Sequence, residues 1–202
     1  LKQRSYSHLD RPEANFSLAL LADAQGDSQA AETHYLRSIE RELAFVPARM
    51  NLATLLSGQG RNPAAEKILR QTTELEPTWG QAYYSLGLLI AEDPARIAEA
   101  ADALRKATAL DPEFSRAHYN LALCLWKMDK RDEAAVEFRK ASSIEPNNPE
   151  YPLDAYEMYR QVKRWKDALP FAEEAASLSF GNTEVLDELE FVRRMVRQQN
   201  PQ

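Results

Sequence analysis

Apolar residues recur along the chain with the spacing of amphipathic α-helices. Leucines between residues 52 and 56 follow the i, i+3, i+4 pattern, and apolar residues between 65 and 69 repeat it. Turn-forming residues separate such pairs, as in LEPTW at 75–79 and LDPEF at 110–114. The pattern therefore predicts an all-α chain built from antiparallel helix pairs.

The hydrophobic pattern itself repeats every 34 or 35 residues. The small residues that define the period form three series: Ala19, Ala53, Gly87 and Ala122; Ala31, Ala65, Ala100, Ala134 and Ala168; and Ser38, Thr72, Ala107, Ala141 and Ala175. Because the intervals agree between series, internal repetition rather than chance explains them. The larger residues expected to fill the space between helices are Tyr35, Leu52, Leu69, Leu86, Leu104, Leu121 and Phe138.

This period divides the chain into five units with a segment on each side. The units are placed at 12–45, 46–79, 80–114, 115–148 and 149–182. Residues 1–11 are predicted to be an N-terminal tail or linker, which also contains His8. Residues 183–202 are predicted to form a C-terminal capping helix and tail, with Val185, Leu186, Leu189, Val192, Met195 and Val196 on one face. Such a helix would cover the last repeat.

Two units depart from the pattern. The third has an extra residue between Gly87 and Ala100, and we expect Asp93 and Pro94 to start its second helix early. Asn62 and Asp93 are the residue types that cap helix N-termini, and each precedes a proline. The fifth unit has Tyr156 in place of the small residue and carries prolines in both helices, so its surface is the least predictable.

The repeats resemble the tetratricopeptide repeat (TPR) family. The resemblance rests on LGLLI at 86–90, NLALCL at 120–125 and DEAAVEFRKASSIEP at 132–146, and it covers residues 12–182. It implies a right-handed superhelical solenoid of antiparallel helix pairs. In that family the first helix of each pair lines a concave groove, which is the usual binding face.

The resemblance also implies which side chains face the groove. The candidate peptide-binding residues are Phe16, Leu20, Met50, Asn51, Thr54, Tyr84, Leu88, Arg116, Tyr119, Asn120, Leu123, Trp126, Lys127 and Arg160. Apolar anchors beside amides such as Asn51 and Asn120 suit an extended or helical peptide. Inter-helix packing is the alternative role for the aromatic members.

The basic and aromatic members of this set have two interpretations. Arg116, Trp126, Lys127 and Arg160 could receive a carboxylate of a ligand, or they could form a solvated helix face. The family's carboxylate clamp requires a lysine, asparagine and arginine set across neighbouring helices. The matching positions hold Phe16 and other uncharged residues, so a receptor for chaperone tails is not expected.

Composition and motifs narrow the function further. The net charge of −6 argues against nucleic-acid partners, and no apolar run is long enough to insert into a membrane. The single cysteine, Cys124, lies six positions after His118 on the same predicted helix, so the two point to opposite faces. No metal-ligand spacing, nucleotide-binding loop or hydrolase motif occurs. We therefore expect no cofactor, no metal and no catalysis.

The leading hypothesis is a non-catalytic module that binds a protein or peptide partner in the groove. The alternative is an architectural domain of a larger bacterial protein, with a weak likeness to modules of periplasmic, cytochrome-like proteins. Self-association into a homo-oligomer is a third interpretation. The sequence does not choose between the cytoplasm and the periplasm for a soluble protein.

Overall fold

The computed structural model describes residues 11–179 and 181–199. Within these residues, regular structure consists of α-helices and one 3-10 helix, with no strand. The predicted all-α class is confirmed. The predicted tail, with His8, lies outside the described residues except for Arg11.

The chain divides into two compact units. The N-terminal unit is Leu1–Glu92 and the C-terminal unit is Asp93–Gln202. The division falls inside the third predicted repeat, where the sequence carries its extra residue.

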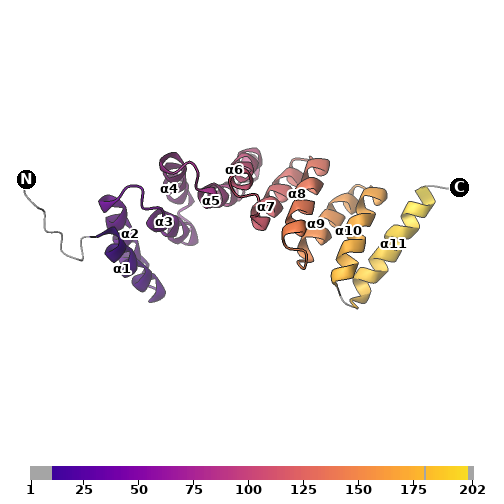
Figure 1. Cartoon of the computed structure of the whole chain (residues 1–202), viewed down its shortest axis with the longest axis horizontal. Helices are drawn as coiled ribbons and strands as arrows, with labels where there is room; N and C mark the ends of the chain where they lie inside the picture. The colour runs from indigo at the N-terminus through magenta and orange to yellow at the C-terminus, as the bar shows by residue number, and fades with distance from the viewer. Residues whose placement is uncertain (1–10, 180, 200–202) are drawn as a thin grey trace, which may run out of the picture. The chain divides into compact units, whose positions relative to one another are not determined.

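The N-terminal unit contains two complete helix pairs and the first helix of another. Its helices are α1 (Pro12–Ala24), α2 (Ser28–Arg41), α3 (Val46–Gly58), α4 (Asn62–Leu75) and α5 (Gly80–Ile90). Within the pairs, α1 packs on α2 and α3 on α4, while α2 contacts α3 and α4 contacts α5 (Figure 1). Within this unit, helices that follow one another in the sequence therefore pack against each other.

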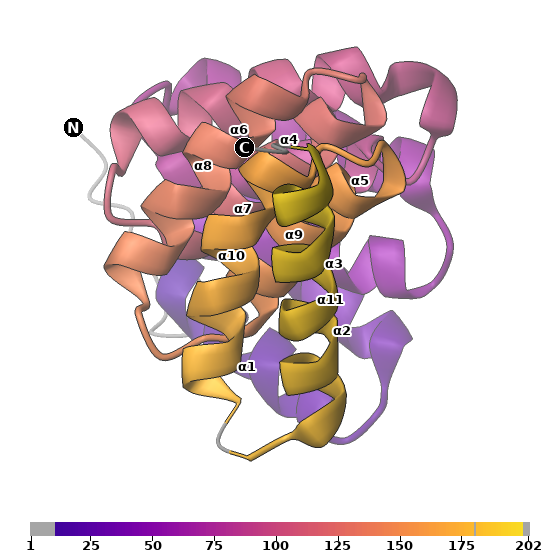
Figure 2. The same cartoon turned by 90° about the vertical axis from the view of Figure 1, so that its right-hand side faces the viewer.

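The C-terminal unit follows the same scheme. Its elements are the 3-10 helix η2 (Pro94–Arg96), then α6 (Ile97–Leu110), α7 (Ser115–Lys127), α8 (Arg131–Ile144), α9 (Glu150–Gln161), α10 (Trp165–Leu178) and α11 (Thr183–Gln199). The pairs are α7 with α8 and α9 with α10, and α11 packs along α10 (Figure 2). We call α1, α3, α5, α7 and α9 the A helices, and α2, α4, α6, α8 and α10 the B helices.

The core consists of the residues that define the period. Ala19, Ala31, Ala65, Ala100, Ala122 and Ala134 are fully buried, and so are the larger Tyr35, Leu104 and Phe138. Leu52, Leu69, Leu86 and Leu121 are at least 95% buried. Small residues let the paired helices approach closely, while the larger ones fill the space between successive pairs. Full burial of each large side chain stabilises the stack by about 1.5 to 3 kcal/mol.

The second helix of the third unit does not begin early, contrary to the sequence-based expectation. The Asp93 side chain accepts a hydrogen bond from the Ala95 amide at 2.9 Å and starts η2, whereas α6 begins at Ile97. The starts of the five B helices are therefore spaced by 34, 35, 34 and 34 residues. The extra residue is absorbed in η2, and the later helices keep their register.

The predicted cap at Asn62 is wrong. Arg61 occupies the cap position of α4 without a side-chain cap, and Asn62 is the first residue of the helix. Asn62 Nδ2 instead donates to Glu92 Oε2 at 2.5 Å. A tertiary partner has therefore replaced the local capping interaction that this residue type favours.

Most turns between the A and B helices of a pair contain one residue with a left-handed backbone. Gly26 and Gly60 hold this place with φ of 76° and 73°, while Asp129 and Lys163 hold it with φ of 63° and 57°. Glycine adopts this conformation without steric cost, whereas a side chain costs about 1 kcal/mol or more. The last two turns thus retain strain that glycine removes in the first two.

Replacing Lys163 with glycine is therefore expected to stabilise the protein. The gain should be about 0.5 to 1 kcal/mol, because relief of backbone strain exceeds the added freedom of the unfolded chain. Urea denaturation followed by circular dichroism measures it. Lys166→Gly in the first turn of α10 is the control and should lower stability. A loss of stability in Lys163→Gly would contradict the strain argument.

The α11 helix buries part of its predicted apolar face. Leu189 and Val192 are buried, and Val185, Met195 and Val196 are half-buried. Leu186, which the sequence placed on the same face, is 43% exposed. Charged residues occupy exposed positions of α11 beside the exposed Leu186 and Phe191, and the capping role of the helix stays a prediction.

Candidate functional site

The predicted groove residues of the N-terminal unit all lie on A helices. The Phe16 ring packs against Tyr35 and Phe45, with centroid separations of 6.1 and 5.5 Å, and is half-buried. Leu20 is exposed, whereas Met50, Asn51 and Tyr84 are half-buried. Phe16 therefore contributes to packing between helices as well as to the surface.

Two predicted residues of this unit meet in a hollow, which we call the N-terminal hollow. Thr54 on α3 and Leu88 on α5 both line it, and α4 contributes Leu69 to the lining. The hollow has a volume of about 370 Å³, and its lining is Ala53, Thr54, Ser57, Gly58, Leu69, Ser85, Leu88, Leu89 and Glu92. It lies between consecutive A helices, where the sequence places the groove.

In the C-terminal unit, Tyr119 joins α7 to α9. Its hydroxyl oxygen lies 2.7 Å from Asp154 Oδ2 and 3.1 Å from Glu150 Oε1. The ring packs against Tyr151 at 5.0 Å and Phe138 at 6.0 Å between centroids. Burial raises the pKa of Tyr119, and the two carboxylates raise it further. Tyr119 is thus a packing residue that holds the fifth repeat against the fourth.

The remaining predicted residues of α7 are at the surface or partly buried. Arg116 and Lys127 are exposed, while Leu123 and Trp126 are half-buried. Asn120 is also half-buried, and its Nδ2 donates to the Arg116 carbonyl at 2.8 Å. This bond ties the amide to its own helix, so binding a peptide backbone would require Asn120 to exchange it.

Arg160 of the predicted basic corner is paired with an acid of its own helix, which fits the interpretation of this corner as a solvated helix face. Arg160 Nε and Nη2 donate to the two carboxylate oxygens of Glu157 at 2.5 and 3.0 Å. The hydrogen bonds with Glu157 are the main reason why the pKa of Arg160 is raised. The guanidinium is already paired with an acid of its own helix, which disfavours the capture of a ligand carboxylate there.

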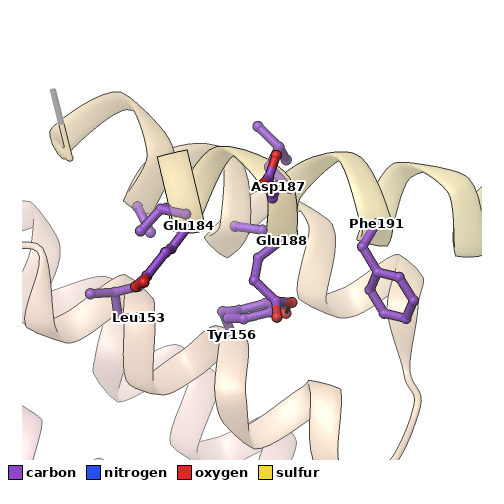
Figure 3. Close-up of a pocket in the computed structure, with 10 residues that line it drawn as sticks. Leu153, Tyr156, Glu184, Asp187, Glu188 and Phe191 are labelled. Atoms are coloured by element: carbon purple, nitrogen blue, oxygen red, sulfur yellow. Dashed lines mark hydrogen bonds between the residues drawn. The ribbon is translucent and has the colours of Figure 1, made fainter. Parts of the chain in front are cut away.

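A hollow in the C-terminal unit was not predicted from the sequence. It has a volume of about 650 Å³ and lies between α9, α10 and α11 (Figure 3). We call it the C-terminal cleft, and its lining is Leu153, Tyr156, Ala172, Ala175, Glu184, Val185, Asp187, Glu188, Leu189 and Phe191. Of its large apolar side chains, Phe191 is the most open, at 39% exposure. This volume is typical of ligand-binding clefts.

Carboxylates form one side of the C-terminal cleft. Glu184, Asp187 and Glu188 are exposed on α11. The buried Tyr156 hydroxyl donates to Glu188 Oε2 at 2.6 Å, and the two side chains face each other in Figure 3. Burial raises the pKa of Tyr156, and the bond to Glu188 adds to this effect. Tyr156 therefore stays a neutral donor, and its hydrogen bond fixes the position of Glu188 beside the apolar residues that line the cleft.

The repeat register explains why a cleft forms here. Leu52, Leu86, Leu121, Ala155 and Leu189 follow one another at intervals of 34, 35, 34 and 34, so α11 continues the series of A helices. The C-terminal cleft lies between α9, α10 and α11, as the N-terminal hollow lies between α3, α4 and α5. The signal was present in the sequence, at Leu189, one period beyond the fifth unit.

In residues 11–179 and 181–199, no three His, Cys, Asp or Glu side chains are grouped in a way that could hold a metal ion. No helix there combines the length and the apolar character needed to cross a bilayer. Cys124 is buried, and burial raises the pKa of its thiol.

Helix pairs of this length and register define an all-α solenoid of the kind used for protein interaction. Two family models described as tetratricopeptide repeat match the chain, one at residues 91–152 and the other at 12–37 and 46–71. Together they cover more than half of the sequence. The chain belongs to the tetratricopeptide repeat family, whose members are generally non-catalytic scaffolds. No curated protein matches it significantly in sequence.

Solved structures share the fold. The crystal structure of MamA has a TM-score of 0.76 and 21% identity, covering 86% of this chain and 94% of the other. YrrB, described as a TPR protein with an unusual peptide-binding site, has a TM-score of 0.73 and 16% identity, covering 91% and 94%. PilF of Pseudomonas aeruginosa has a TM-score of 0.69 and 20% identity, covering 94% and 92%. At these identities the likeness concerns the fold.

Proposed function

We propose that this protein binds peptide segments of a partner on the A helices of each unit, a surface to which α11 contributes in the C-terminal unit. The observation that carries the proposal is the C-terminal cleft, which exposes Phe191 and Leu153 beside oriented polar groups. Apolar surface with a few fixed polar groups is what peptide-binding grooves offer. The N-terminal hollow, at the equivalent place between α3, α4 and α5, supports the same role.

The test uses a charge placed in both hollows. Peptides are selected from a random phage-displayed library on the wild-type protein and titrated by calorimetry. The double variant Leu88→Arg/Phe191→Arg should bind them at least about tenfold more weakly, because each arginine removes an apolar contact surface and its long side chain fills part of the hollow. Leu88 and Phe191 are 36% and 39% exposed, so both variants should still fold.

The matched control is Leu36→Arg/Val136→Arg. Leu36 and Val136 are 42% and 53% exposed, and they lie on the B helices α2 and α8. This control should bind the selected peptides like the wild type. Equal loss in both double variants, or no loss in either, would contradict binding on the A-helix face.

A further inference from the structure

Carboxylates continue from the C-terminal cleft along α9. Glu150, Asp154 and Glu157 follow one another there at nearly one-turn spacing, and Glu184, Asp187 and Glu188 line the cleft from α11. We call these six residues the acidic face. Burial raises the pKa of Asp154, and the charges of Glu150 and Glu157 raise it further. The carboxylates of α9 therefore repel one another in the folded protein.

Among the described residues, Arg160 compensates part of this charge: it forms an ion pair with Glu157, and the charge of Glu188 further raises its pKa. The donors to Glu150, Asp154 and Glu188 are the hydroxyls of Tyr119 and Tyr156, which are neutral at pH 7. A ligand that brings positive charge would relieve the repulsion, whereas an acidic ligand would add to it.

Resting on the proposed function, we infer that the C-terminal cleft binds an amphipathic helical segment with lysine or arginine side chains beside bulky apolar ones. The apolar side chains would lie against Leu153 and Phe191 on the floor. The cationic side chains would reach Asp187 and Glu188, one helical turn away. Charge complementarity selects this occupant, since the cleft combines an open apolar floor with carboxylates on one side.

The inference is tested with two model peptides that differ in the sign of their charge. The amphipathic peptide LKKLLKLLKKLLKL and its counterpart LEELLELLEELLEL are labelled with fluorescein and titrated with the protein by fluorescence anisotropy. The lysine peptide should bind at least about tenfold more tightly than the glutamate peptide, with an affinity that falls as salt is added. Equal affinities would overturn the inference.

A matched pair of charge reversals tests whether the lysine peptide binds in the C-terminal cleft. Asp187→Lys should weaken binding of the lysine peptide by about tenfold or more. Glu190→Lys makes the same charge change on the same helix, but Glu190 does not line the cleft and pairs with Arg193 at 3.0 Å. It should weaken binding less than Asp187→Lys does, because the Glu190 carboxylate is already paired with Arg193 and is not offered to the ligand. Equal loss in both variants would mean attraction to net charge only and would overturn the inference.

The library selection separates this inference from the proposed function. Selected peptides that lose affinity for Leu88→Arg/Phe191→Arg, yet are acidic or insensitive to Asp187→Lys, would overturn the inference and leave the proposed function standing. Failure of both the selected and the lysine peptides to bind would overturn both.

Discussion

Replacing Phe138 with alanine is expected to destabilise the protein by about 3 to 5 kcal/mol. The Phe138 side chain is fully buried on α8, so its removal loses apolar burial and leaves a cavity. It also removes the ring that packs against Tyr119, which joins the fourth and fifth repeats. Stability in such stacks depends on contacts between neighbouring repeats, so the C-terminal unit should unfold at lower urea concentration.

Val136→Ala is the matched control for this substitution. Val136 lies on the same helix two positions away and is 53% exposed. Its loss should change the free energy of unfolding by less than about 0.5 kcal/mol. Equal effects of the two substitutions would show that α8 does not hold the hydrophobic contacts described for it.

The second large effect is expected at His118. Its Nδ1 lies 2.6 Å from Glu137 Oε2 and its Nε2 lies 3.1 Å from the Pro112 carbonyl oxygen. Both side chains are largely buried, with exposures of 5% and 14%. His118→Ala would remove both buried contacts and should cost about 2 to 3 kcal/mol, measured by urea denaturation at neutral pH.

The second partner of Glu137, Lys140, allows a comparison with the loss of His118. The other carboxylate oxygen of Glu137 accepts from Lys140 Nζ at 2.9 Å, but the lysine side chain is 51% exposed. Lys140→Ala should therefore cost less than about 1 kcal/mol. If Lys140→Ala cost as much as His118→Ala, burial would not be the source of the difference.

The same carboxylate makes stability depend on pH. Burial raises the pKa of Glu137, but hydrogen bonds from His118 and Lys140 outweigh it and bring the pKa below its ordinary value of 4.5. A lowered folded pKa stabilises the protein above the unfolded pKa, and this stability is lost as the pH falls through the folded value. Glu137→Gln should therefore lose less stability than the wild type between neutral pH and about pH 3.5.

Much of the fold follows from local pattern, because helix pairs stack only on their neighbours. The small residues at Ala31, Ala65, Ala100 and Ala134 fix how closely helices approach, and one period predicts the next. The backbone of the turns at Asp129 and Lys163 was not evident, since only the glycines of the first two turns signal a left-handed residue.

The candidate site was less predictable, because it depends on residues that meet across repeats. Tyr119 was predicted to face a ligand, but Asp154 and Glu150 of the irregular fifth repeat engage its hydroxyl. Arg160 is another example, because its guanidinium forms an ion pair with Glu157 of the same irregular repeat. The sequence predicts α11 as a cap, and Leu189, which keeps the repeat register, is the signal for the C-terminal cleft.

The position of the extra residue in the third repeat bears on how such chains vary in length. One residue inserted inside an α-helix would turn every later side chain by roughly 100° about the axis and misplace the buried stripe. In η2 the insertion leaves the start of α6 and the later helices in phase. The link from α5 to α6 is therefore a place where the chain can be lengthened, by evolution or by insertion of a short tag, without changing which residues form the buried core.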